Sequence, residues 1–334
     1  MGYIERFLKE KKAHKLSTLE KIALTGEIIW QFKEEIFNVN YRAKLKEDFF
    51  PEQRLVGWFD TASQSYIYKF FKQYFNSQMF NSENLPSKKG ALLVANHSTI
   101  FLADVAPIYI GAYEKKRRCL YGLAFKMIAK SDILKTIGGV NGTRDLGMKL
   151  LKEDKLTLVC PGGILDACKP FYDSYLVKPV GGFSPEHCGY VKIAFATNKP
   201  IIPVAVIGAE ETAIILGDAK GFVKKCMGLL DMAFSLRKGP WFNSLYELVD
   251  FAKVVPFLLN YLPLKGNIEA YVGTEINVRE FIGDNPQQED FAFVNQLVMS
   301  RLQGMIDKGL KKRKHLARVN KTIKNLKFII SGKK

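Results

Sequence analysis

The sequence predicts an α/β protein, in which helices pack on a central sheet. Short apolar runs of strand length recur through the second and third quarters of the chain, and segments with apolar residues at helical spacing separate them. The chain has 334 residues, of which 47% are hydrophobic. That is enough for one large α/β domain with additional segments, or for two ordinary domains.

Residues 1–84 predict a helical region in front of the sheet. Residues 19–37 contain good helix formers and no proline, and residues 64–80 are rich in aromatic side chains. Core packing of a helical layer is the favoured interpretation of both segments, and an aromatic surface that faces a membrane is the alternative. The linker at 84–90, with its proline and glycine, marks the predicted boundary of the next domain.

Residues 85–308 predict the α/β domain itself. The apolar run that opens it is continuous, as in a strand buried on both faces. Alternation of strands with helices then favours a sheet that helices cover. The expected strands lie within 91–98, 119–128, 155–160, 199–208 and 267–276, and the expected helices within 185–198 and 288–310.

Basic residues are concentrated at the end of the chain. The formal net charge is +17, and residues 308–334 contain many Lys and Arg but no Asp or Glu. Apolar residues in this tail follow one another at steps of three and four, which predicts a basic amphipathic helix over part of 309–334 that lies on an anionic membrane surface. Docking of the same stripe on the domain is the alternative. The stripe consists of Leu316, Val319, Ile323, Leu326 and Ile330.

Residues 217–264 form a long and unusually apolar connection between two expected strands. This inserted lobe is interpreted as the wall of an apolar tunnel, a lobe that dips into a membrane or a plain helical subdomain. No apolar run reaches the roughly 18 residues of a transmembrane helix, and the N-terminus lacks the apolar core of a signal peptide. Peripheral association with the cytoplasmic face of a membrane is therefore expected.

The cysteines and the basic tail exclude other classes of site. Five scattered cysteines without a C-x-x-C pair predict free thiols in a reducing compartment and no metal site. The basic tail lacks interleaved aromatic residues, and no nucleic-acid-binding module is visible, so no nucleic-acid partner is expected.

Three segments carry chemically distinctive residues at predicted strand ends or turns: His97 with Asp104, the segment 138–144, and the segment 160–163. Loops that follow parallel strands gather at one edge of a sheet, where ligands bind. A histidine there can take a proton from a hydroxyl near neutral pH, and a carboxylate on its other ring nitrogen fixes the tautomer. Ser98 and Thr99 lack a nucleophile elbow, so the hydroxyl is expected to belong to a substrate.

The other site candidates would bind the substrate. Arg144 can pair with an anion through its guanidinium group, or it is a surface residue that begins a helix. Asn141 and Gly142 precede it in a turn where a glycine lets the backbone approach a ligand. Gly162 and Gly163 offer backbone amides to an oxyanion, or they form an ordinary tight turn.

These segments, in this order, resemble the glycerolipid acyltransferase superfamily, which includes glycerol-3-phosphate, lysophosphatidate and lysophospholipid acyltransferases. The matching blocks are His97 with Asp104, then 138–144, 160–163 and 202–204, so the resemblance covers about residues 85–300. It implies a glycerol-3-phosphate-acyltransferase-like sheet. It also implies a catalytic His97–Asp104 pair, an Arg144 that contacts the acceptor, and acyl-CoA or acyl-carrier protein as co-substrate without a bound cofactor.

Two features depart from the family pattern. The family usually places four residues between the histidine and the aspartate, whereas six lie between His97 and Asp104 here. In a regular helix this spacing would separate the two Cα atoms by roughly 10 Å. The third block is usually Phe-Pro-Glu-Gly, whereas Gly162 replaces the glutamate. This resembles the branch that acts on mono- and diacylglycerols, which often has a glutamate shortly afterwards, where this chain has Asp166.

Two functions remain open on the sequence. The first is a membrane-associated O-acyltransferase that acts on a glycerolipid or a lysophospholipid, with an acceptor that is phosphate-bearing or neutral. The second is a non-catalytic protein that binds lipid or nucleic acid on the same fold.

Overall fold

The structure is a computed structural model. It describes residues 49–63, 66–98, 103–124, 135, 137–177, 188–218, 256–258 and 263–313. The helix expected within 19–37, the apolar stripe expected in the tail and most of the inserted lobe at 217–264 lie outside the described residues. Every structural statement below concerns the described part of the chain.

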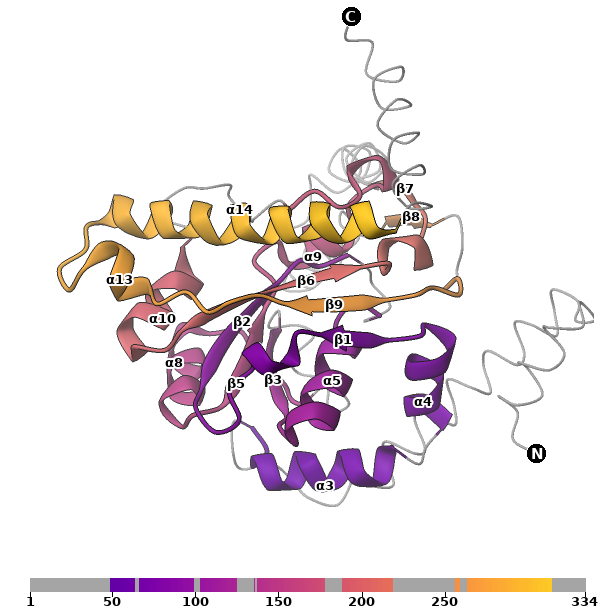
Figure 1. The fold of residues 1–334 in the computed structure, drawn as a ribbon, viewed down its shortest axis with the longest axis horizontal. Helices are drawn as coiled ribbons and strands as arrows, with labels where there is room; N and C mark the ends of the chain where they lie inside the picture. Colours follow the sequence, from indigo (N-terminus) through magenta and orange to yellow (C-terminus); the bar gives the residue numbers. More distant parts are fainter. Residues whose placement is uncertain are drawn as a thin grey trace, which may run out of the picture.

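A seven-stranded mixed sheet forms the centre of the molecule (Figure 1), which confirms the predicted α/β class. Its strand order is β1-β9-β6-β2-β5-β3-β4. Strand β2 pairs in parallel with both β5 and β6, whereas β9 runs antiparallel to β6. The strands span Gln78–Phe80 (β1), Ala91–Ala95 (β2), Leu120–Ala124 (β3), Gly139–Asn141 (β4), Leu156–Val159 (β5), Ile201–Ile207 (β6) and Glu269–Val272 (β9).

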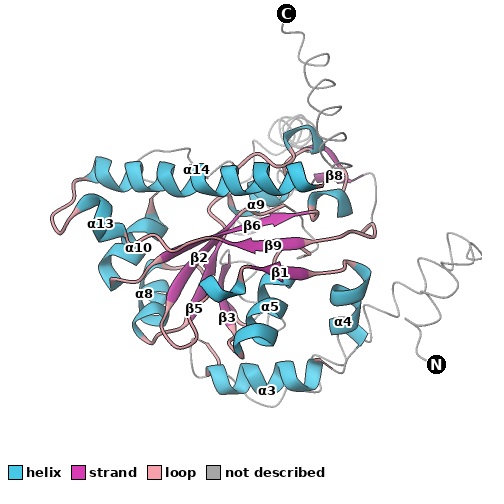
Figure 2. Ribbon diagram, viewed as in Figure 1, coloured by secondary structure: helices cyan, strands magenta, loops and turns pink. Residues whose placement is uncertain are grey.

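Helices cover both faces of this sheet (Figure 2). The long helix α14 packs on β6, α8 packs on β5 on the same side, and α5 covers the opposite face. The main helices span Glu52–Ala62 (α3), Ala106–Lys116 (α5), Arg144–Lys152 (α8), Gly189–Thr197 (α10) and Gln288–Lys312 (α14). Short helices span Tyr66–Lys69 (α4), Phe70–Tyr74 (η1), Ser82–Asn84 (η2), Gly163–Ala167 (α9), Phe171–Asp173 (η3), Glu210–Thr212 (η5) and Val278–Ile282 (α13). A separate antiparallel pair consists of Ile215–Asp218 (β7) and Pro256–Leu258 (β8).

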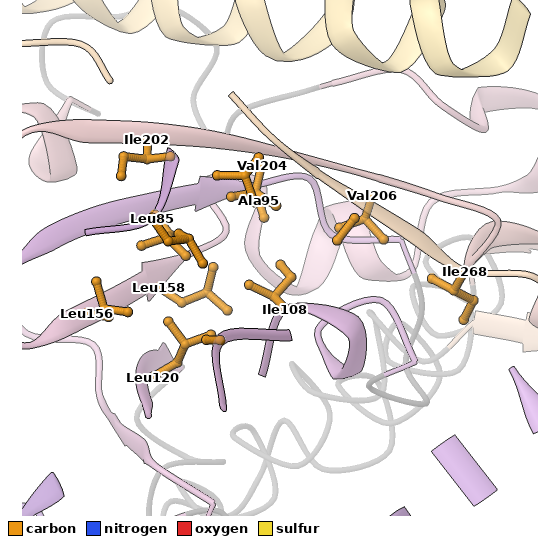
Figure 3. Close-up of a cluster of buried hydrophobic side chains, with 14 of the residues drawn as sticks. Leu85, Ala95, Ile108, Leu120, Leu156, Leu158, Ile202, Val204, Val206 and Ile268 are labelled. Atoms are coloured by element: carbon orange, nitrogen blue, oxygen red, sulfur yellow. The ribbon is translucent and has the colours of Figure 1, made fainter. Parts of the chain in front are cut away.

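Strand β2 is buried on both faces, which explains its unbroken apolar sequence. Leu93 belongs to the core beneath α5, whereas Leu92 and Val94 belong to the core beneath α10 and α14. In Figure 3, Ile108 of α5 lies among Leu158 and other aliphatic side chains of the sheet. This rigid double-sided core fixes the point at which β2 ends and the loop that carries His97 begins.

The described part of the N-terminal region joins the same fold. Strand β1 pairs with β9, and Phe50, Leu55 and Phe59 share a core with Tyr121 of β3. The predicted boundary at 84/85 therefore falls inside the sheet, because β1 precedes it. The aromatic segment that follows α4 is largely core, since Tyr74 and Phe75 are buried.

Among the described strands, four had not been expected: β1, which lies in the region predicted to be helical, and β4, β7 and β8. Residues 139–141 form edge strand β4, where the sequence suggested a glycine-rich turn. Strand β3 is its hydrogen-bonded partner. Two adjacent glycines made this strand hard to predict from the sequence. Among the described residues, no helix has both the length and the apolar composition that a membrane crossing requires.

Candidate active site

The predicted site segments lie at one edge of the sheet. Strands β2, β3, β4, β5 and β6 are parallel, so the loops that follow them leave the sheet on the same side. His97 follows β2, Gly162 follows β5, Arg144 follows β4 and Glu210 follows β6. The edge therefore collects side chains from segments that are far apart in the sequence.

His97 and Asp104 are in direct contact. The imidazole Nδ1 lies 2.5 Å from Asp104 Oδ2, which also accepts the Ser98 N–H at 2.8 Å. The other oxygen, Oδ1, accepts the Val105 N–H at 2.9 Å. Residues 103–105 form a turn before α5, so the helical separation of about 10 Å does not apply. The structure thus brings the two residues together despite their long spacing.

The two members of the pair differ in exposure. The Asp104 side chain is fully buried, whereas 19% of the His97 side chain is exposed. Within the described part of the chain, Nε2 has no hydrogen-bond partner. The buried carboxylate holds Nδ1, and Nε2 is the ring nitrogen that can meet a substrate.

The pair also sets its own protonation. Burial alone would lower the pKa of His97, but the charge and hydrogen bond of Asp104 raise it on balance above its ordinary value. Burial alone would raise the pKa of Asp104, but His97 and two backbone N–H groups lower it on balance. Asp104 therefore stays ionised and stabilises an imidazolium.

Asn96 fixes the start of the loop. Its side-chain amide donates to the Val206 carbonyl at 2.9 Å and accepts the Val206 N–H at 2.8 Å. The side chain thereby continues the pairing of β2 with β6 by one step after the strand has ended. This role was not predicted from the sequence, because a strand-end asparagine usually indicates only a turn.

The loop after β5 approaches His97 through Asp166. The Asp166 Oδ2 atom accepts the His97 backbone N–H at 3.0 Å. A Cβ atom on Gly162 would lie only 2.3 Å from the Asp166 Cβ atom, so the Asp166 side chain occupies the space of any side chain at position 162. Gly163 is less available than expected, because its N–H already donates to the Cys160 carbonyl at 2.9 Å. Of the two glycines, Gly162 remains the candidate oxyanion donor.

Arg144 is not in contact with the pair. It begins α8, where the Thr143 hydroxyl caps the helix by accepting the Leu146 N–H, and its side chain is exposed. Three strand spacings, about 14 Å in total, separate β4 from β2. Gly142 is exposed and packs against the Ala124 carbonyl, where a Cβ atom would lie 2.9 Å away.

A shallow open pocket lies beside the start of α8 rather than at the imidazole. Asn141 is among its lining residues, which also include Thr143, Asp145, Leu146 and Lys149. The sheet edge that carries His97 thus also carries Asn141, Gly142 and Arg144. These residues are so far from His97 that only an extended substrate would contact both places. Among the described residues, no three His, Cys, Asp or Glu side chains converge on a point where a metal ion could bind.

The parallel strands of a mixed sheet present a histidine–carboxylate pair at their loop edge, and this arrangement defines an α/β protein with a candidate acid–base site. Residues 76–207 match the family model named Acyltransferase. This match confirms the resemblance to the glycerolipid acyltransferase superfamily, and it includes the segments of His97, Asp104, Arg144 and Gly162.

Relatives extend the comparison over the same region. An uncharacterized protein of Mycobacterium leprae is 29% identical over 157 residues, which are 45% of this chain and 41% of the relative. Phytyl ester synthase 2, chloroplastic, of Arabidopsis thaliana is 28% identical over 148 residues, which are 41% of this chain and 20% of the relative. The chain thus spans less than half the length of these curated relatives. A 1-acyl-sn-glycerophosphate acyltransferase from Thermotoga maritima aligns with a TM-score of 0.46 at 15% identity, over 84% of this chain and 88% of that one.

Proposed function

We propose that the protein transfers a fatty acyl group from a thioester donor, acyl-CoA or acyl-carrier protein, to a hydroxyl of a glycerolipid or lysophospholipid, with His97 as general base. The observation that carries this proposal is the imidazole held by a fully buried carboxylate at 2.5 Å while 19% of the His97 side chain remains exposed. The match of residues 76–207 to the family model named Acyltransferase supports the reaction type.

The proposed step moves one proton and one acyl group. His97 Nε2 takes the proton of the acceptor hydroxyl while the oxygen attacks the thioester carbonyl. The tetrahedral intermediate then breaks its C–S bond, and the departing sulfur receives the proton from the imidazolium. Asp104 stabilises the imidazolium between the two proton transfers. The Gly162 amide is the candidate donor to the oxyanion.

Peripheral membrane association is part of the proposal. The described chain ends at Arg313, whose Nη2 donates to the Asn267 carbonyl at 2.5 Å, and Asn267 lies next to Gly208 at the end of β6. Strand β7 starts shortly after η5, and the Leu264 N–H donates to the Thr212 carbonyl at 2.8 Å, so both ends of the lobe at 217–264 leave the fold after β6. The two segments that the sequence suggested as membrane contacts therefore join the fold at the edge that carries His97. This arrangement supports a site that faces a cytoplasmic membrane surface with anionic lipid.

A thioester-turnover assay tests the activity. Release of free thiol from acyl-CoA and from acyl-carrier protein is measured with a panel of lysophospholipid and acylglycerol acceptors in detergent or vesicles. Wild-type protein should release thiol in an acceptor-dependent manner, and His97→Gln should not, although its circular dichroism and Tm stay close to those of wild type. Lipid binding without turnover over the whole panel would support the non-catalytic alternative. Wild-type turnover by folded His97→Gln would exclude His97 as the base.

A further inference from the structure

A buried ammonium group lies behind the catalytic loop. The Lys169 side chain is 6% exposed, and its Nζ lies 2.9 Å from Asp166 Oδ1 and 2.9 Å from Glu210 Oε1. The same Nζ donates to the Leu176 carbonyl at 3.2 Å and to the His97 carbonyl at 3.4 Å. Burial alone would lower the pKa of Lys169, but Glu210 and Asp166 raise it on balance, so the ammonium stays charged.

The cluster joins three neighbouring loops. Asp166 and Lys169 follow β5, Glu210 follows β6, and His97 follows β2, which lies between those two strands. The side chains of Asp166 and Glu210 are 2% and 5% exposed, so all three charges are removed from water. Buried charges of this kind are stable only together, because each one alone would carry a large desolvation cost.

The backbone of His97 is held on both sides by this cluster. Asp166 Oδ2 accepts the N–H of His97, and Lys169 donates to its carbonyl oxygen. Asp104 holds the ring at Nδ1. Three contacts therefore fix one residue, and two of them come from the Lys169–Asp166 ion pair.

We infer that Lys169, with Asp166 and Glu210, is a positioning residue that fixes the His97 backbone and so aims Nε2 at the acceptor hydroxyl. This inference rests on the proposed function, since it assigns a role in the same reaction. In this role the three side chains act through the His97 backbone and not on the substrate. The role is to keep His97 in position. A displacement of about 1 Å at a catalytic group can cost about 100-fold in rate.

The test compares Lys169→Met and Lys169→Arg in the full chain with Lys199→Met as the matched control. Lys199 also forms a lysine–aspartate pair, 2.6 Å from Asp154, but it precedes β6 and lies at the opposite end of that strand. Lys169→Met should lower kcat about 100-fold, while the donor KM changes by less than about threefold. Lys169→Arg should recover at least about tenfold of the loss, because it keeps the charge. Lys199→Met should keep the wild-type kcat.

Two readouts separate positioning from plain stability. The charged groups that act on the imidazole are Asp104 and Asp166, which raise the pKa of His97, and Lys169, which lowers it. The acidic limb of the kcat/KM profile should therefore move to higher pH in Lys169→Met. The downfield proton NMR resonance of His97 Nδ1–H, assigned by its absence in His97→Gln, should weaken in Lys169→Met and persist in Lys199→Met.

The outcomes are distinct. If wild type shows the resonance but turns over no thioester with any acceptor, the proposed function fails, and the resonance in the variants still decides the positioning role. A wild-type protein without the resonance contradicts the role. If Lys169→Met does not fold, Asp166→Asn and Glu210→Gln replace it and should each give a partial fall in kcat and a weaker resonance. Folded variants with wild-type kcat, pH profile and resonance would overturn the inference.

Discussion

Asp104 Oδ2 lies 2.5 Å from His97 Nδ1, although the two residues are seven positions apart in the chain. The turn at 103–105 returns the chain to the imidazole immediately before α5 begins. The Ser98 N–H donates to the same carboxylate oxygen, so the first residue after the histidine also helps to close this loop.

Replacement of Asp104 by Asn should remove both the tautomer control and the charge that favours the imidazolium. We expect kcat to fall about 10³- to 10⁴-fold, as for other oriented histidine bases. In the proposed reaction neutral His97 is the active form and Asp104 raises its pKa, so the acidic limb of the rate profile should move to lower pH. Asp307→Asn, an exposed carboxylate on α14, is the control. Equal pH profiles for wild type and Asp104→Asn would contradict the pairing.

Arg144→Ala tests whether the acceptor reaches the start of α8. The guanidinium is exposed and lies at the edge that carries His97, so it can meet only the distal part of an extended acceptor. We expect the KM for lysophosphatidate to rise about tenfold. This change corresponds to about 1.4 kcal/mol, which is the size of the contribution of one charge-assisted hydrogen bond. The KM for monoacylglycerol and for the donor should stay unchanged. Lys152→Ala, at the other end of α8, is the control, and equal effects on all three KM values would assign Arg144 a structural role.

Gly162→Ala should displace Asp166, because the new Cβ atom would lie 2.3 Å from the Asp166 Cβ atom. Overpacking of this kind costs about 1 to 3 kcal/mol in the free energy of unfolding. Because Asp166 holds the His97 N–H, kcat should also fall, by about 100-fold. Gly57→Ala is the control, since nothing lies within 4 Å of that Cβ position in α3. It should stabilise the protein by roughly 0.5 to 1 kcal/mol without a change in kcat.

Glu211→Gln should stabilise the protein at alkaline pH. Burial raises the pKa of Glu211 to about 7, whereas the group ionises near 4.5 in the unfolded chain. The folded state therefore binds more protons between these values, and its stability decreases as pH rises from about 4.5 to 7. The glutamine keeps an oxygen that can accept the Tyr175 hydroxyl proton. We expect a gain of about 1 to 3 kcal/mol at pH 8 and little at pH 4, measured by urea unfolding. The same gain at both values would show that ionisation is not the cause.

Removal of residues 314–334 should abolish binding to anionic vesicles. Ending the chain at Arg313 keeps Leu310 in the core and Arg313 on the Asn267 carbonyl, so the truncated protein should stay folded. Co-sedimentation with phosphatidylserine vesicles should be lost, and binding of the full-length chain should weaken as salt is added. Unfolding of the truncated chain would indicate a tail packed on the domain. Unchanged binding would assign the anchor to the lobe at 217–264.

The sequence predicted the features that depend on local pattern. The apolar runs that became β2, β5 and β6 and the periodic segment that became α14 follow directly from hydrophobic spacing. The gathering of the loops at one edge follows from the parallel order of the strands. The pairing of His97 with Asp104 could be expected from the sequence, but its geometry could not, because the contact depends on the conformation of a loop rather than on a regular repeat.

The ion cluster of Lys169 shows what pattern analysis cannot supply. Glu210 lies 41 positions after Lys169, and both residue types usually indicate a solvated surface. Only the order of β6, β2 and β5 in the sheet brings them together behind His97. Strand β4 was missed for a different reason, since its pairing with β3 outweighs the weak strand propensity of glycine.

The pairing of β1 with β9 has a consequence for synthesis of the chain. Asn76 contacts Asn267 beside this pair, and the two residues are 191 positions apart. A ribosome that adds about 5 to 20 residues per second needs on the order of 10 to 40 s to cover that distance. During this interval β1 has no partner strand, whereas β2, β5 and β6 can already assemble from the segment that includes His97. The loop that carries His97 is therefore expected to form before the sheet is complete, and β9, the last strand of this sheet to be synthesised, then joins β1 to β6.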